Sequence, residues 1–157
     1  MQQQATATDT VIEVWRRFLH AHCALTRTVD TELRSAHGLT INDFDVLVQL
    51  SHAENHRIRM SELADRVLLT RSGMTRLIDG LVRDGLVERV SCQADARVAY
   101  ASLTADGDEL LQQARATHHR TIMDSFAGCF TDEQLAQFYE LLGNLPTSLP
   151  SCSCDAH

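Results

Sequence analysis

The fold is decided by residues 61–90, which read SELADRVLLTRSGMTRLIDGLVRDGLVERV. Apolar residues recur there every three or four positions, which is the spacing of helices with one buried face. The pattern predicts two closely spaced helices, over 61–67 and 71–84, with Thr70 as the N-cap of the second and Gly85 at its end. Such a pair is typical of a helix-turn-helix, in which the second helix lies in the major groove of DNA.

The second helix of this pair has two contrasting faces. Its inward stripe consists of Met74, Leu77, Ile78, Leu81 and Val82. Its opposite face carries polar residues near the start of the helix, namely Arg71, Ser72, Thr75, Arg76 and Asp79. Arginine, serine and threonine reach phosphates and base edges, so this face is predicted to contact DNA. An ordinary solvated helix face has the same composition and is the alternative for this helix taken alone.

A β-hairpin is expected directly after the two helices. Residues 86–92 and 97–103 are β-rich runs, and the polar residues 93–96 between them predict a turn. A helix-turn-helix followed by such a hairpin is a winged helix. The expected fold is therefore mainly α with a small β-hairpin wing, in which the winged helix-turn-helix lobe spans about residues 40–103.

Long helices are predicted on both sides of this lobe. The apolar spacing after Val11 indicates an amphipathic helix over about 10–36, and Gly38 sits where it would end. Two further helices are expected within about 105–145. Helices with one narrow apolar stripe cannot bury themselves in so small a domain, so they are expected to pair with a second subunit.

Polar residues mark where several of these elements begin. Thr40 with Asp43 is a capping pair that opens a helix after Gly38. Thr104 is placed to cap the first of the two C-terminal helices, and Thr131 with Gln134 is a capping box that opens the second. The polar stretch 51–59 is expected to connect the helix after Gly38 to the short helix that begins near Ser61.

Length and composition favour one globular domain over residues 1–157, with a flexible tail at 146–157. The sequence contains no run of eighteen apolar residues and no signal peptide, so a cytoplasmic protein is expected. It also contains no glycine-rich phosphate loop, metal-protease motif or nucleophile elbow. The chain is therefore expected to be neither an enzyme nor dependent on a cofactor.

Positive charge is concentrated in the middle of the chain. The net charge of −7 argues against a protein that coats nucleic acid indiscriminately. Between Arg57 and Arg97, eight arginines stand among six acids, a net of +2, whereas the remainder holds six arginines and fifteen acids, a net of −9. All fourteen basic residues are arginine, whose planar fork suits phosphates and guanine edges. The middle third is the part expected to face DNA.

Four blocks follow one another without a large insertion over about residues 39–111. They are SELA at 61–64, RSGMTRLID at 71–79, LVRDGLVER at 81–89, and DAR at 95–97 leading to LTADG at 103–107. In this order they resemble the MarR family of winged helix-turn-helix transcriptional regulators. The resemblance implies a homodimer whose first and last two helices interlock. The two lobes would then meet successive major grooves of a pseudo-palindromic operator in double-stranded DNA.

The resemblance also implies DNA contacts in the wing. Arg97 at the wing tip is expected to enter the minor groove, with Asp95 holding it in position, and Arg89 is a further expected contact. An arginine on a narrow hairpin matches the enhanced negative potential of a narrow minor groove. An ordinary surface pair of Asp95 and Arg97 is the alternative.

A small-molecule effector is a further implication of the resemblance. Family effectors lodge between the dimerisation helices and the lobe, where the first helix contributes a side chain at about the position of Arg16. A guanidinium there favours a carboxylate, and Trp15, His20 and His22 nearby could pack on a ring or bond a phenol. A repressor released by a small aromatic carboxylate is therefore expected. Alternatively, Arg16 is solvated or paired with Glu13.

Other readings stay open at this point. His22 could be a satisfied interface histidine. Some relatives sense zinc, and the weak candidate ligands here are His118, Cys152, Cys154 and His157. Other relatives carry a reactive cysteine on the first helix, at the position that Arg16 occupies. Cys23 lies seven residues later and is expected to be a small buried cysteine. A helical binding protein without a DNA target is the remaining alternative.

Overall fold

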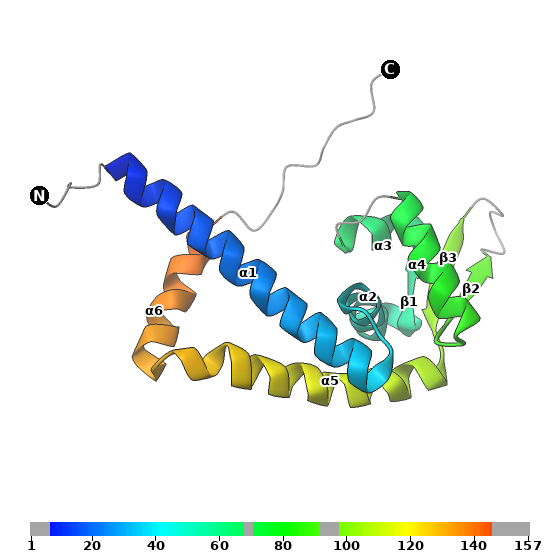
Figure 1. Cartoon of the computed structure of the whole chain (residues 1–157). Helices are drawn as coiled ribbons and strands as arrows, with labels where there is room; N and C mark the ends of the chain where they lie inside the picture. Colours follow the sequence, from blue (N-terminus) through cyan, green and yellow to red (C-terminus); the bar gives the residue numbers. More distant parts are fainter. Residues whose placement is uncertain (1–6, 68–70, 92–97, 146–157) are drawn as a thin grey trace, which may run out of the picture.

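The structure is a computed structural model that describes residues 7–67, 71–91 and 98–145. Within these residues it consists of helices around one small sheet (Figure 1). The predicted turn at 93–96, the wing residues Asp95 and Arg97, the N-cap Thr70 and the C-terminal tail lie outside the described residues. The predicted fold class, mainly helical with a small winged-helix sheet, is confirmed.

Helix α1 (Ala7–His37) is the long amphipathic helix that the sequence predicts. Asp9 in its first turn and Arg34 and His37 in its last turn complement the helix dipole. It ends at Gly38, whose φ of +71° is a left-handed conformation that suits glycine. Its C-terminal half packs on α5, where His37 Nε2 and Thr117 Oγ1 share a hydrogen bond of 2.8 Å. Its N-terminal half is exposed in the single chain.

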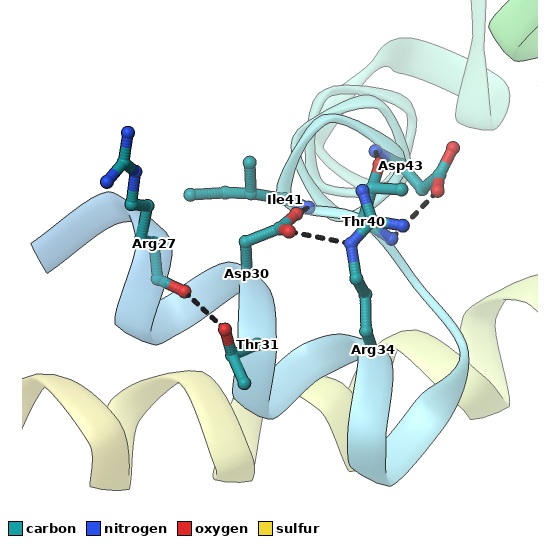
Figure 2. Close-up of polar contacts among 7 residues, drawn as sticks. All are labelled: Arg27, Asp30, Thr31, Arg34, Thr40, Ile41 and Asp43. Atoms are coloured by element: carbon teal, nitrogen blue, oxygen red, sulfur yellow. Dashed lines mark hydrogen bonds and ion pairs between the residues drawn. The ribbon is translucent and has the colours of Figure 1, made fainter. Parts of the chain in front are cut away.

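A polar junction joins α1 to helix α2 (Ile41–His52) (Figure 2). Asp30 on α1 accepts hydrogen bonds from the backbone N–H of Ile41 at 2.9 Å and from Arg34 Nε at 2.6 Å. Thr40 and Asp43 form the predicted capping box, with both reciprocal bonds present at 3.0 and 2.8 Å. The first N–H groups of α2 are thus satisfied partly by α2 itself and partly by α1.

The core of the winged-helix lobe, which comprises α2 to α4 and the sheet, is apolar. Helices α3 (Met60–Arg66) and α4 (Arg71–Arg83) pack on α2. The fully buried side chains there include Leu47, Leu50, Leu63, Met74 and Ile78. Val82, predicted on the inward stripe of α4, is exposed. That prediction was wrong because the buried stripe is narrower than predicted: Leu81 in the same turn is buried, whereas Val82 lies at the edge of the stripe.

The sheet has three antiparallel strands in the order β1-β3-β2. Strands β2 (Val87–Ser91) and β3 (Ala99–Leu103) are the predicted hairpin, which is confirmed. Strand β1 (Arg57–Arg59) and the 3-10 turn η1 (Glu54–His56) lie within the stretch predicted to be a polar connector. The sequence interpretation did not include this strand, which forms because Ile58 is buried opposite Ala101 and β3 supplies the hydrogen bonds.

Helix α5 (Ala105–Ser125) starts against the end of the lobe. Thr104 caps it as predicted, since its Oγ1 accepts from Gly107 N at 3.0 Å and donates to the carbonyl of Gly85 at 2.8 Å. A Cβ at Gly107 would overlap the carbonyl oxygen of Leu86, so only glycine permits this close approach. Gly85, with φ +75°, ends α4 as predicted.

Helix α6 (Asp132–Gly143) follows the 3-10 turn η2 (Ala127–Cys129). The predicted capping box of Thr131 and Gln134 is present at 3.3 and 2.9 Å. Three aromatic rings hold α6 against the end of α5, with centroids 5.2 to 5.9 Å apart; they are Phe126, Phe130 and Phe138. Figure 1 shows α5 as a long edge with the lobe at one end and α6 at the other.

Candidate DNA-binding site

Packing fixes which face of α4 looks outward. Met74, Ile78 and Leu81 are buried in the lobe, so the helix cannot rotate without losing core contacts. The opposite side is exposed as predicted and carries Ser72, Thr75, Arg76 and Asp79. Arg71 is the first residue of the helix, and its side chain lies outside the described residues. The structure thus brings most of the predicted DNA-contacting side chains to one solvent-accessible face.

An ion pair connects the wing to this helix. Arg89 Nη2 on β2 lies 2.8 Å from Asp79 Oδ1 on α4. Both side chains are substantially exposed, so the pair orients the two elements more than it stabilises the fold. Arg89 therefore has an intramolecular partner, and its role as a DNA contact stays a prediction.

A hollow opens between the start of α4 and the sheet. Its volume is about 410 Å³, and its lining includes Arg59 at the end of β1, Ser61 on α3 and Thr75 on α4. Val98 and Ala99, at the start of β3, form one side of the hollow. Arg59 thus lies next to the exposed face of α4. The sequence interpretation missed it, although the polar–apolar–polar alternation of residues 57–59 was a signal for a half-buried strand.

The predicted effector residues all lie on the exposed N-terminal half of α1. Arg16 Nη1 is 3.3 Å from Glu13 Oε2, and Arg17 Nε is 2.9 Å from the other oxygen of the same carboxylate. The bond from Arg17 is the main reason that the pKa of Glu13 lies below its ordinary value. Trp15 stacks on Phe18 with centroids 6.1 Å apart. The structure therefore has the predicted alternative pairing of Arg16 with Glu13.

His20 and His22 are also exposed on this part of α1. No contact in the described chain brings them against the winged-helix lobe. Cys23 is exposed as well, so its prediction as a buried cysteine is wrong for the single chain. The reason is that the described chain provides no element that covers this half of α1.

His118, the described member of the candidate zinc set, is part of the α2–α5 packing. Its ring stacks on Phe44 with centroids 4.6 Å apart. Burial lowers the pKa of His118, while the charge of Asp45 opposes that shift. Among the described residues, no three histidine, cysteine or acidic side chains are grouped to hold a metal ion. Cys152, Cys154 and His157 lie outside the described residues.

Comparisons with known proteins identify the family. A family model described as the MarR family matches residues 37–98. AbsC, a MarR family transcriptional regulator from Streptomyces coelicolor, superposes with a TM-score of 0.77 at 30% identity, covering 90% of this chain and 93% of AbsC. The chain belongs to the MarR family.

Other MarR regulators share its sequence and fold. The HTH-type transcriptional repressor YetL of Bacillus subtilis is 35% identical over 108 residues, which are 69% of this chain and 64% of YetL. Sco3205, a MarR family regulator of Streptomyces coelicolor solved in complex with DNA, has a TM-score of 0.78 at 27% identity, with 96% of both chains covered. The match spans just under two thirds of the curated relatives' length.

These MarR relatives are transcription regulators rather than enzymes, as the sequence predicted for this chain. The predicted family and the winged-helix fold are confirmed. No helix in the described ranges is both long and apolar enough to span a membrane.

Proposed function

We propose that this chain is a DNA-binding transcription regulator that acts as a homodimer, with α4 in the major groove of a pseudo-palindromic operator. The observation that carries the proposal is the exposed face of α4, where Ser72, Thr75 and Arg76 stand beside the wing on a helix fixed by its buried side. Two relatives support it: YetL is a transcriptional repressor, and Sco3205 was solved in complex with DNA. We propose that the regulator represses transcription.

The dimer in this proposal forms through helices outside the lobe. Large apolar side chains are exposed on both ends of the chain, among them Val14, Trp15 and Phe18 on α1 and Leu141, Leu142 and Leu145 at the C-terminal end. Trp15 is 57% and Leu141 64% exposed. Contiguous exposed apolar side chains of this size mark a surface that another chain covers.

A gel shift tests the DNA-binding proposal. Arg76→Ala is expected to weaken binding to the promoter fragment that flanks the gene by about 1–3 kcal/mol and to relax preference at one base position. Arg83→Ala is the matched control, since Arg83 lies at the far end of α4 with an exposed partner, Asp84, at 3.5 Å. Equal effects of the two substitutions would mean that the face near Arg76 is an ordinary solvated surface.

The wing contributes to the same proposal. Arg97 is proposed to enter the minor groove, oriented by Asp95, although both lie outside the described residues. Support comes from strands β2 and β3, which form the antiparallel hairpin whose connecting segment contains these two residues. The ion pair between Arg89 and Asp79 links the hairpin to α4. Replacing Arg97 with alanine is expected to weaken binding without unfolding the protein.

The proposed effector is a small aromatic carboxylate that binds at Arg16. The pair of Arg16 with Glu13 is exposed and longer than the pair of Arg17 with the same carboxylate, so it contributes little free energy. A ligand carboxylate could take over Arg16 while Arg17 continues to neutralise Glu13. In the proposed dimer, Trp15 is the nearby aromatic surface for the ring of the ligand.

The zinc- or thiol-responsive alternative gains less support. The described thiols Cys23 and Cys129 are exposed, but they lie on different elements, and among the described residues neither belongs to a group of three potential metal ligands. Thermal-shift measurements with aromatic acids and with zinc would distinguish the two kinds of effector, because a ligand raises the melting temperature of the state that it binds.

A further inference from the structure

Two arginines of β1 flank one tyrosine of β3 on the outer face of the wing sheet. Arg57 and Arg59 alternate with the buried Ile58, so both side chains lie on the exposed face of the strand. Tyr100 is the register partner of Arg59. The guanidinium carbons of Arg57 and Arg59 lie 5.5 and 5.9 Å from the centre of its ring. We refer to these three residues as the Arg57–Tyr100–Arg59 cluster.

Tyr100 holds the two arginines by different contacts. Arg59 Nε donates a hydrogen bond of 3.2 Å to the hydroxyl oxygen of Tyr100. The guanidinium of Arg57 lies within the range of a cation–π contact with the ring. Both contacts restrict long side chains that would otherwise lose rotamer freedom on binding a ligand. The cluster is therefore preorganised before any partner arrives.

Arg57 is the member of the cluster whose charge has no ion-pair partner among the described residues. Six other arginines in that part of the chain do form ion pairs, namely Arg16, Arg17, Arg34, Arg66, Arg83 and Arg89. A tyrosine ring attracts cations but does not neutralise them. An anion that binds beside the ring would therefore be attracted by the positive charge of Arg57.

The position of the cluster indicates which anion fits. Arg59 and Thr75 line the same hollow of about 410 Å³, so Arg59 lies beside the exposed face of α4. A duplex whose major groove holds α4 places its phosphate backbone along the flanks of that helix. The wing sheet occupies such a flank in the structure (Figure 1).

We propose that Arg57 and Arg59 bind backbone phosphates of the DNA and that Tyr100 is a positioning residue that orients both guanidinium groups for this contact. The inference rests on the proposed function, since it requires that α4 binds a duplex. Phosphate contacts carry no sequence information, so the cluster would set affinity and register while α4 reads the bases.

The salt dependence of binding tests the two arginines. Arg57→Ala and Arg59→Ala are each expected to reduce the slope of log affinity against log salt by about 1, with equal losses for the promoter fragment and an unrelated duplex. Arg27→Ala is the matched control, because it removes the same charge from α1, outside the lobe. Its slope is expected to match that of the wild type.

A double-mutant cycle tests the role of Tyr100. Tyr100→Phe removes the hydroxyl acceptor but keeps the ring, so we expect affinity for either duplex to fall about 2- to 10-fold. In an Arg59→Ala background the same substitution is expected to have no further effect, because its consequence passes through Arg59. A direct contact of Tyr100 with DNA would instead give additive losses and overturn its positioning role.

The outcomes separate this inference from the proposed function. If the wild type binds the promoter fragment while Arg57→Ala and Arg59→Ala keep its slope and affinity, the phosphate contact is wrong and the proposed function stands. If the wild type binds no duplex at any salt concentration, the proposed function fails and the inference fails with it. Thermal unfolding of each variant is the control that tests whether the lobe remains folded.

Discussion

At the scale of single residues, Arg16 and Arg17 can be compared directly because both pair with the carboxylate of Glu13. Both guanidinium groups bond Glu13, yet the contact of Arg17 is 0.4 Å shorter (2.9 against 3.3 Å) and it is the main reason that the pKa of Glu13 is lowered. If Arg16 binds a ligand instead, Glu13 therefore keeps its shorter contact, the one with Arg17. If Arg17 bound the ligand, Glu13 would keep only the longer contact with Arg16.

The prediction that follows concerns release from DNA. Arg16→Ala is expected to leave promoter affinity nearly unchanged while raising the benzoate or hydroxybenzoate concentration needed for release by about 10- to 100-fold, since a charge-assisted bond is lost. Arg17→Ala is the control and should respond almost as the wild type does. Fluorescence titration of the protein–DNA complex measures both. An unchanged response of Arg16→Ala would remove this residue from the effector site.

The difference between predicted and observed residues has a physical pattern. Outward positions on α4 were predictable because the helical period alone fixes them relative to Met74 and Ile78. Arg59 and Tyr100 were not, since their contact joins residues far apart in the sequence and depends on the register of β1 with β3. Arg16 was recognised as a candidate, but its pairing could only be left as an alternative, because helical spacing allows Glu13 to reach both arginines.

At the scale of elements, the junction between α1 and α2 depends on one carboxylate. Asp30 bonds the backbone N–H of Ile41 and the guanidinium of Arg34, and these bonds place its pKa below the ordinary value, with the Ile41 bond the larger cause (Figure 2). A group whose pKa is lowered by folding stabilises the folded state above its ordinary pKa. That stabilisation disappears as the pH falls through the lowered value.

Asp30→Ala is accordingly expected to lower the free energy of unfolding by about 1–3 kcal/mol at pH 7, because a charged acceptor is lost. The difference from the wild type should shrink at acidic pH, once Asp30 is protonated in the folded protein as well. Urea unfolding at pH 7 and pH 3 measures the effect, with Glu32→Ala, an exposed carboxylate of the same helix, as the control. A difference that is equal at both pH values would contradict this role.

Elements with their own caps were predictable, whereas elements defined by a neighbour were not. The starts of α2, α5 and α6 follow from Thr40, Thr104 and Thr131, whose side chains bond nearby backbone N–H groups. Strand β1 is three residues long, so the alternation of its residues is too short to identify a strand by itself. It exists because β3 offers an unpaired edge, which only the folded lobe provides.

At the scale of the whole molecule, the proposed dimer can be tested by changing residues of α6. Leu142→Asp is expected to place an unpaired charge in the proposed interface, so the dimer should dissociate and promoter affinity should fall with it. Gln137→Asp adds the same charge on the opposite face of α6 and should leave the dimer intact. Light scattering on the purified proteins measures the mass. A Leu142→Asp variant that stays dimeric would show that α6 does not form the interface.

The contact of Gly107 with Leu86 and the bond of Thr104 to Gly85 have a mechanical consequence. They join the first turn of α5 to the segment between α4 and β2, so a rotation of α5 is expected to carry α4 and the wing with it. With 21 residues, α5 acts as a lever arm about 30 Å long. A tilt of about 5° at its far end would carry the lobe through about 3 Å, which is comparable to the length of a hydrogen bond to DNA.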